Sequence, residues 1–183
     1  TLGLPFKSMT THSNNHAEYY TGSVSITLKL LYSPDGKIYG AQAVGAAGTE
    51  KRIDVIATAM RGKLSVYDLE DLELCYAPPF GSSRDPVNIA GFTAGNELRG
   101  DVPTLQWSDL ADLDPEKWFF LDVRQPEELA IGKVPGAINI PLAELRARTA
   151  ELPRDKKILV NCARGKRSYY ALRALRQLGF DAW

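Results

Sequence analysis

A buried strand, a short loop and an amphipathic helix follow one another near the end of the chain, and this order constrains the fold more than any other feature. The apolar run Lys157–Asn161 (KILVN) is typical of a buried strand, and Ser168–Leu178 has the spacing of an amphipathic helix that ends at Gly179. Trp118–Val123 (WFFLDV) is a second buried strand, and Ala143–Ala150 between the two is helix-like. Strands that alternate with helices predict an α/β layer with a parallel sheet.

The first half of the chain has a different pattern. Ser23–Tyr32 alternates apolar and polar residues, Ser33–Gly36 (SPDG) has the composition of a turn, and Ile38–Val44 is a second β-compatible run. These three segments predict an antiparallel hairpin.

Helix signals follow the hairpin. The expected elements are a helix capped by Thr49 and ended by Gly62, a short helix after Ser65, a strand at Leu72–Tyr76, and a helix from Asp85-Pro86 to about Arg99. In the first of these helices the residues at helical spacing are Ile53, Ile56, Ala57 and Met60. Strands with helices behind them predict an α+β domain.

The apolar pattern weakens between Gly100 and Asp114, where polar and acidic residues accompany Pro103 and a second proline follows at Pro115. Such a stretch is typical of a linker and the entry to a new domain. We therefore expect a first domain over residues 1–100, a linker over 101–117 and a second domain over 118–183.

Composition excludes several classes of protein. The chain of 183 residues has 22 Lys and Arg against 22 Asp and Glu, which argues against an overall footprint for nucleic acid or an anionic membrane. Two cysteines and two histidines are too few for a Cys/His zinc site or a disulfide framework, and we expect no metal. No apolar run approaches the roughly 18 residues of a membrane span, and the first residues lack a signal-peptide plan. We expect a cytoplasmic protein.

Cys162 combines the features of an activated thiol. It directly follows a strand and precedes a helix N-terminus, where α/β sheets bind ligands. Converging backbone N–H groups, the helix dipole and the charges of Arg164, Lys166 and Arg167 all favour thiolate. A thiol with a pKa near 8.5 is about 3% ionised at pH 7, and one with a pKa near 6 is about 90% ionised. The alternative is a small buried apolar side chain at a strand end.

The second domain resembles a rhodanese domain. The motifs that carry the resemblance are Asp122-Val123-Arg124, Glu127-Glu128, Gly132-Lys133-Val134-Pro135-Gly136-Ala137-Ile138-Asn139-Ile140-Pro141 and Cys162-Ala163-Arg164-Gly165-Lys166-Arg167-Ser168. The resemblance implies that Cys162 carries sulfane sulfur as a persulfide, that the backbone of residues 163–167 cradles the substrate, and that Asp122 and Arg124 brace the site. It also implies a domain truncated at its C-terminus, because the chain stops at Trp183, before the last turn and helix of such domains.

Two details bear on this interpretation. Lys133 stands where the family often has His. A phosphatase of the Cys-x5-Arg type needs Arg six positions after the cysteine, but that position is Ser168 and the arginine, Arg167, comes one residue early. The resemblance implies that the shorter loop suits sulfur better than phosphate, and phosphatase or arsenate reductase activity is the lesser alternative.

The first domain resembles the dimerisation domain of flavin-dependent pyridine nucleotide-disulfide oxidoreductases, in the coenzyme A-disulfide reductase branch. The resemblance is carried by His16-Ala17-Glu18-Tyr19-Tyr20-Thr21-Gly22, Lys51-Arg52-Ile53-Asp54, Cys75-Tyr76-Ala77-Pro78-Pro79-Phe80 and Asp85-Pro86-Val87-Asn88. It implies a homodimer and a parent protein that uses FAD, NAD(P)H and coenzyme A to reduce coenzyme A disulfides, persulfides or polysulfides. A non-catalytic module that dimerises and binds a sulfur species or a partner is the alternative.

In that branch two tyrosines reach the partner subunit's active site, and these correspond to Tyr19 and Tyr76. A phenol can donate a proton to a leaving thiolate; the alternative is that both tyrosines are half-buried packing residues. Lys51 and Arg52 are weaker candidates for contacts with coenzyme A phosphates, the alternative being a solvated helix turn. The remaining expectations are a core position for Cys75 and surface positions for His12 and His16.

The sequence lacks a G-x-G-x-x-G fingerprint after a strand. The flavin and nicotinamide domains of the parent are therefore expected to precede this chain, and we expect the chain alone to bind none of the three cofactors.

Overall fold

The computed structural model describes residues 3–183, which form two compact units that divide between Arg99 and Gly100. Each unit has its own hydrophobic core. Residues 101–117, expected to be a linker, lie in the second unit, where Val102 packs against the core. Within residues 3–183, no helix combines the length and apolar character needed to cross a membrane.

The first unit contains an antiparallel sheet in the order β1-β2-β3, formed by β1 (Lys7–Asn14), β2 (Ser25–Tyr32) and β3 (Ile38–Gly45). The predicted hairpin of β2 and β3 is confirmed. Its turn closes through the N–H of Gly36, which donates to the Ser33 carbonyl at 2.9 Å, and Gly36 has the positive φ of 89° that favours glycine.

Strand β1 was not predicted, because its sequence KSMTTHSN is mostly polar and lacks an apolar alternation. Only Met9 and Thr11 are buried within it. It pairs with β2 along its whole length, from Lys7 opposite Tyr32 to Asn14 opposite Ser25. Pairing with an established strand, rather than composition, therefore determines this element.

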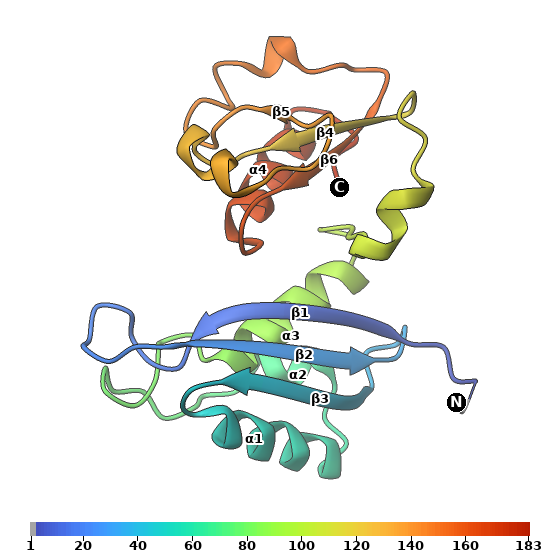
Figure 1. Cartoon of the computed structure of the whole chain (residues 1–183). Coiled ribbons are helices and arrows are strands. Elements are labelled where there is room, and N and C mark those ends of the chain that lie inside the picture. Colours follow the sequence, from blue (N-terminus) through green and yellow to red (C-terminus); the bar gives the residue numbers. More distant parts are fainter. Residues whose placement is uncertain (1–2) are drawn as a thin grey trace. The chain divides into compact units, whose positions relative to one another are not determined.

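Three helices cover one face of this sheet (Figure 1), namely α1 (Thr49–Arg61), α2 (Val66–Asp71) and α3 (Pro86–Leu98). Every second residue of β2 faces the helices, which gives the burial alternation expected of a half-covered strand. The fully buried side chains of the core include Ile26, Leu28, Leu30, Tyr32, Val66, Leu69, Val87, Ala90 and Ala94. The α+β architecture predicted for this unit is confirmed.

Two local details differ from the prediction for α1. Its N-cap is Gly48, with φ 79°, and not Thr49, which is the first helical residue. A Cβ atom on Gly48 would lie 2.6 Å from an Arg52 nitrogen, so glycine is needed there. The buried residues of α1 are Arg52, Ile56 and Ala59, whereas Ala57 and Met60 are exposed.

The predicted strand at Leu72–Tyr76 is wrong. This segment has no regular secondary structure, because no strand lies beside it. Instead the Leu72 carbonyl accepts a hydrogen bond from Asn88 Nδ2 at 2.9 Å. The predicted N-cap of α3 is confirmed, since the Asp85 carboxylate accepts from the N–H of Val87.

The second unit contains a parallel sheet in the order β5-β4-β6, formed by β4 (Trp118–Asp122), β5 (Ile138–Asn139) and β6 (Lys157–Asn161). Helix α4 (Lys166–Gln177) packs against β6 (Figure 1). Residues 181–183 run parallel to β6, held by three backbone hydrogen bonds: two that Ile158 makes with Asp181 and Trp183, and one from the Val160 N–H to the Trp183 carbonyl. The predicted parallel α/β layer is confirmed.

Short 3-10 helices complete this unit: η1 (Trp107–Asp112), η2 (Pro126–Ile131) and η3 (Thr149–Glu151). The α-helix predicted at Ala143–Ala150 is wrong. Most of its backbone hydrogen bonds span three residues rather than four, such as that from the Ala147 N–H to the Glu144 carbonyl, so the segment forms tight turns.

Candidate functional site

The thiol of Cys162 lies in a cradle of hydrogen bonds at the carboxyl end of β6. The N–H groups of Gly165 and Ser168 donate to Cys162 Sγ at 3.1 and 3.3 Å. The thiol lies 3.5 Å from Ser168 Oγ, which itself donates to the Gly165 carbonyl at 2.8 Å. Gly165 precedes α4 with a φ of 92°, so a residue without a side chain makes the tight turn that brings these N–H groups onto the sulfur.

These hydrogen bonds favour the thiolate. Burial of the sulfur acts to raise the pKa of Cys162, but hydrogen bonding by the Ser168 side chain and by the backbone of Ser168, Arg164 and Gly165 outweighs it, and the pKa lies below its ordinary value. The sequence predicted that backbone N–H groups, the helix dipole and three cationic side chains would favour the thiolate. The structure confirms the backbone hydrogen bonds, but one of those cations, Arg167, is paired with a carboxylate.

That carboxylate belongs to Glu128, whose oxygens accept from Arg167 Nη1 and Nη2 at 2.5 and 2.7 Å. Glu128 also accepts from the Gln125 N–H at 3.0 Å, which fixes it within η2. The Arg167 ion pair and the Gln125 hydrogen bond lower the pKa of Glu128 to about 2. Sequence reasoning named Glu128 only as part of a motif; its position three residues after Gln125, as in a capping box, was the available signal.

Asp122 and Arg124 support η2 from the end of β4. Arg124 Nη2 donates to Asp122 Oδ2 at 2.7 Å, and the Asp122 side chain is only 1% exposed. Arg124 also donates to the carbonyls of Glu128 and Gly132, at 3.3 and 2.7 Å. Burial acts to raise the pKa of Asp122, but the hydrogen bonds from Arg124 prevail and lower it. A continuous polar network thus joins β4, η2 and the cysteine loop.

The remaining loop residues, Ala163, Arg164 and Lys166, are exposed. Within residues 3–183, neither Arg164 nor Lys166 forms an ion pair. Lys133 is also exposed. The two loop cations are therefore the ones available to an anionic substrate that approaches Cys162.

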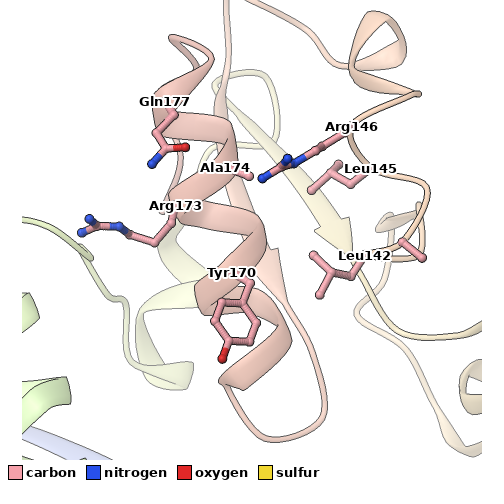
Figure 2. Close-up of a pocket in the computed structure, with 8 residues that line it drawn as sticks. Leu142, Leu145, Arg146, Tyr170, Arg173, Ala174 and Gln177 are labelled. Carbon is pink, nitrogen blue, oxygen red and sulfur yellow. The ribbon is translucent and has the colours of Figure 1, made fainter.

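An open groove of about 520 Å³ runs along α4 in the same unit (Figure 2). Leu142, Leu145 and Ala174 supply apolar atoms, and Arg146, Tyr170, Arg173 and Gln177 supply polar groups. Cys162 does not line this groove, so the candidate site is the cradle around the thiol and not the cavity.

In the first unit, the two predicted tyrosines meet. Tyr19 Oη lies 2.9 Å from Tyr76 Oη, and the side chains are 77% and 49% exposed. The alternative that they are half-buried packing residues therefore does not hold for Tyr19. Their segments are joined by the Ala17 N–H, which donates to the Gly81 carbonyl at 3.0 Å. The hydrogen bond with Tyr76 raises the pKa of Tyr19, so the phenol stays protonated.

The expectation that Arg52 contacts coenzyme A is wrong. Its side chain is 2% exposed, and Arg52 Nη2 donates to Asp85 Oδ2 at 2.7 Å and to the Asn15 carbonyl at 2.6 Å. These bonds join the end of β1 to the start of α3. In the sequence, Asn15 directly precedes the Tyr19 segment and Asp85 follows the Tyr76 segment. Lys51 is partly exposed and stays a prediction for coenzyme A phosphates.

Two further expectations are corrected. Cys75, expected in the core, is exposed, because its segment has no strand partner and runs over the surface. His16, expected at the surface, is 8% exposed; its Nδ1 lies 3.1 Å from the Ala17 carbonyl and its ring packs edge-on against Tyr20. His12 is exposed, as predicted. Among the described residues, no cluster of three His, Cys, Asp or Glu side chains is placed to bind a metal ion.

Comparisons with known proteins match both units. Residues 3–86 match the pyridine nucleotide-disulphide oxidoreductase dimerisation domain, and residues 107–183 match the rhodanese-like domain. A coenzyme A disulfide reductase of Staphylococcus aureus is 37% identical over 90 residues, which are 49% of this chain and 20% of that protein.

Two solved structures resemble nearly the whole chain. Reduced CoADR-RHD of Bacillus anthracis is 45% identical with a TM-score of 0.94, over 97% of this chain and 32% of that one. A NAD-dependent persulfide reductase from A. fulgidus is 37% identical with a TM-score of 0.86, over 98% and 32%. The chain thus spans about a fifth of the curated relatives and a third of the solved chains. Its first unit is thus similar to a pyridine nucleotide-disulphide oxidoreductase dimerisation domain and its second to a rhodanese-like domain, in the order found in these two solved structures.

Proposed function

We propose that Cys162 carries sulfane sulfur within a flavin- and NAD(P)H-dependent reductase of coenzyme A disulfides, persulfides or polysulfides. The observation that supports this most directly is the cradle of N–H groups around the Cys162 sulfur, which lowers its pKa. The lowered pKa of Cys162 also favours a nucleophilic role for this residue over the alternative of a non-catalytic module, because a module that only binds a partner does not need a thiolate.

The transfer has two balanced steps. The Cys162 thiolate attacks the outer sulfur of a persulfide, R–S–SH; a new S–S bond forms to Cys162, the S–S bond of the donor persulfide breaks, and the thiolate RS⁻ leaves. A second thiolate, R′S⁻, then attacks the outer sulfur of the Cys162 persulfide, forms R′–S–SH and returns the Cys162 thiolate. The cradle stabilises the negative charge on sulfur before the first step and after the second.

The exposed cations Arg164 and Lys166 fit an anionic donor or acceptor, since both belong to the Cys162 loop and neither forms an ion pair within residues 3–183. Coenzyme A derivatives are anionic thiols and belong to this class. Ala163 and Gly165, which have no bulky side chains, leave the loop open to the approaching sulfur.

No glycine-rich strand-to-helix turn of the required spacing is present among residues 3–183, so no step through FAD or NAD(P)H is assigned to them. When bound elsewhere in the parent protein, the flavin would supply electrons from the nicotinamide to a disulfide. In this proposal Tyr19 and Tyr76 lie in a dimer interface and donate a proton to a leaving thiolate at the partner's reductase site.

The test of the sulfur-carrier role uses the full chain and a matched pair of variants. Cys162→Ser should abolish transfer of sulfane sulfur to cyanide, because the attacking atom is lost. Cys75→Ser removes the other cysteine, which lies exposed in the first unit, and should leave the rate within twofold of the unsubstituted chain. Transfer that persists in Cys162→Ser would refute the role.

A further inference from the structure

Arg167 follows Cys162 by five residues, and both of its terminal nitrogens donate to one carboxylate. Glu128 accepts from both Nη1 and Nη2, so the bidentate edge of the guanidinium faces a carboxylate of the same chain. The pair is partly exposed, at 32% for each side chain, so solvent and small anions can reach it. Arg167 and Cys162 are close enough to interact electrostatically.

Glu128 is held in place by hydrogen bonds to both its side chain and its backbone. Its side chain accepts from the Gln125 N–H, and its own carbonyl accepts from Arg124 Nη1 at 3.3 Å. Arg124 is anchored in turn by Asp122, which is buried at the end of β4. Because the anchor belongs to the sheet, Glu128 is positioned independently of the cysteine loop that it restrains.

We propose that Glu128 is a positioning residue that keeps Arg167 from binding oxyanions, so that the Cys162 loop accepts sulfur in preference to phosphate-like groups. The preference for sulfur rests on the proposed function of Cys162, whereas the pairing of Glu128 with Arg167 does not depend on it. An arginine five residues after a thiolate, with both terminal nitrogens free, would give the loop a charge-assisted anion site near the sulfur. Glu128 removes that site because it accepts from both nitrogens and adds a negative charge.

The experiment measures how well inorganic phosphate protects Cys162 of the full chain from alkylation by iodoacetamide. Glu128→Gln frees the guanidinium but keeps an oxygen that can accept from the Gln125 N–H, so η2 retains its cap. We expect phosphate to bind this variant about tenfold more tightly, which is the effect of one charge-assisted bidentate contact. Glu128→Asp, which keeps the carboxylate, should bind phosphate about as weakly as the unsubstituted chain.

Two further variants separate positioning from a merely structural role. In the double variant Glu128→Gln with Arg167→Met, the gain in phosphate affinity should disappear, because the freed cation is absent. Arg167→Met alone should change phosphate affinity less than twofold, since Arg167 is already occupied. The matched control is Glu127→Gln, which changes the neighbouring exposed carboxylate and should have no effect.

The proposal is overturned if Glu128→Gln binds phosphate no more tightly than the unsubstituted chain, if the double variant keeps the gain, or if Arg167→Met alone weakens phosphate binding severalfold. Phosphate protection is measured without any sulfur donor. A failure of sulfur transfer to cyanide would therefore refute the proposed function and leave this result unaffected.

Discussion

The hydroxyl oxygens of Tyr19 and Tyr76 lie 2.9 Å apart although 57 residues separate them in the sequence. Neither ring is packed into the core, so the contact joins two surface segments that the backbone bond from Ala17 to Gly81 already brings together. In such a pair one hydroxyl donates to the other, and the second hydroxyl keeps its own hydrogen free to donate to a third group. Either tyrosine can take either role.

The first prediction concerns this contact. The bond to Tyr76 is the main cause of the raised pKa of Tyr19, so Tyr76→Phe should lower the pKa of Tyr19 towards its ordinary value of 10.0. An NMR titration of the tyrosine ring signals measures it directly. Tyr20→Phe, a change at the neighbouring exposed tyrosine, should leave the Tyr19 titration unchanged. A Tyr19 titration unmoved by Tyr76→Phe would show that the two phenols do not bond in solution.

The second prediction concerns the thiolate of Cys162. The Ser168 N–H donates to the sulfur, and the Ser168 hydroxyl, 3.5 Å away, can turn from the Gly165 carbonyl to donate to the thiolate once Cys162 has lost its proton; only the hydroxyl is lost in Ser168→Ala. The pKa of Cys162 should therefore rise, and the rate of its alkylation at neutral pH should fall, because less thiolate is present. Cys75 in the same sample serves as an internal reference whose rate should not change. An unchanged pH profile would show that the backbone alone sets the acidity.

The third prediction concerns the buried ion pair of Arg52 and Asp85. Asp85→Ala leaves the Arg52 guanidinium, 2% exposed, without its carboxylate and also removes the N-cap of α3. Removal of one partner of a buried pair costs about 3–5 kcal/mol in the free energy of unfolding. Hydrogen exchange of the β2 amides in urea reports on this unit.

The control for this prediction lies in the same turn of α1. Lys51→Met alters the partly exposed neighbour of Arg52 and should change the free energy of unfolding by no more than about 0.5 kcal/mol. If Asp85→Ala were equally mild, the pair would contribute nothing to the stability of the first unit.

Elements with a strong local pattern could be predicted from the sequence. The β2–β3 hairpin, the start of α3 and the strand–loop–helix around Cys162 each combine an apolar period with turn or cap residues. Strand β1 could not be predicted, because its stability comes from pairing with β2 rather than from its own polar residues. The segment Leu72–Tyr76, followed by Pro78-Pro79, predicted a strand for which the fold provides no neighbour.

The candidate site shows the same limit. The sequence placed Cys162 in its loop correctly, because strand, loop and helix are adjacent in the chain. It could not show that Arg167 is bound by Glu128, 39 residues away, or that Arg52 faces the core rather than solvent. From sequence alone, a charged residue next to a site is taken to be available to a ligand. Its ion-pair partner is distant in the sequence and becomes known only from the folded structure.

The last prediction concerns pH. The pKa of Glu128 lies at about 2 in the folded chain against an ordinary 4.5, so the folded state favours the carboxylate. The stability that the Glu128–Arg167 pair contributes is therefore fully present above pH 4.5 and is lost as the pH falls from 4.5 towards 2, where the folded state also takes up the proton. All three tryptophans lie in the second unit, so their fluorescence in urea follows its unfolding. The difference in unfolding free energy between the unsubstituted chain and Glu128→Gln should be constant from pH 7 to pH 5 and shrink between pH 4 and pH 3. Glu127→Gln should show no such trend, and a difference that stays constant down to pH 3 would mean that Glu128 is not held by Arg167 in solution.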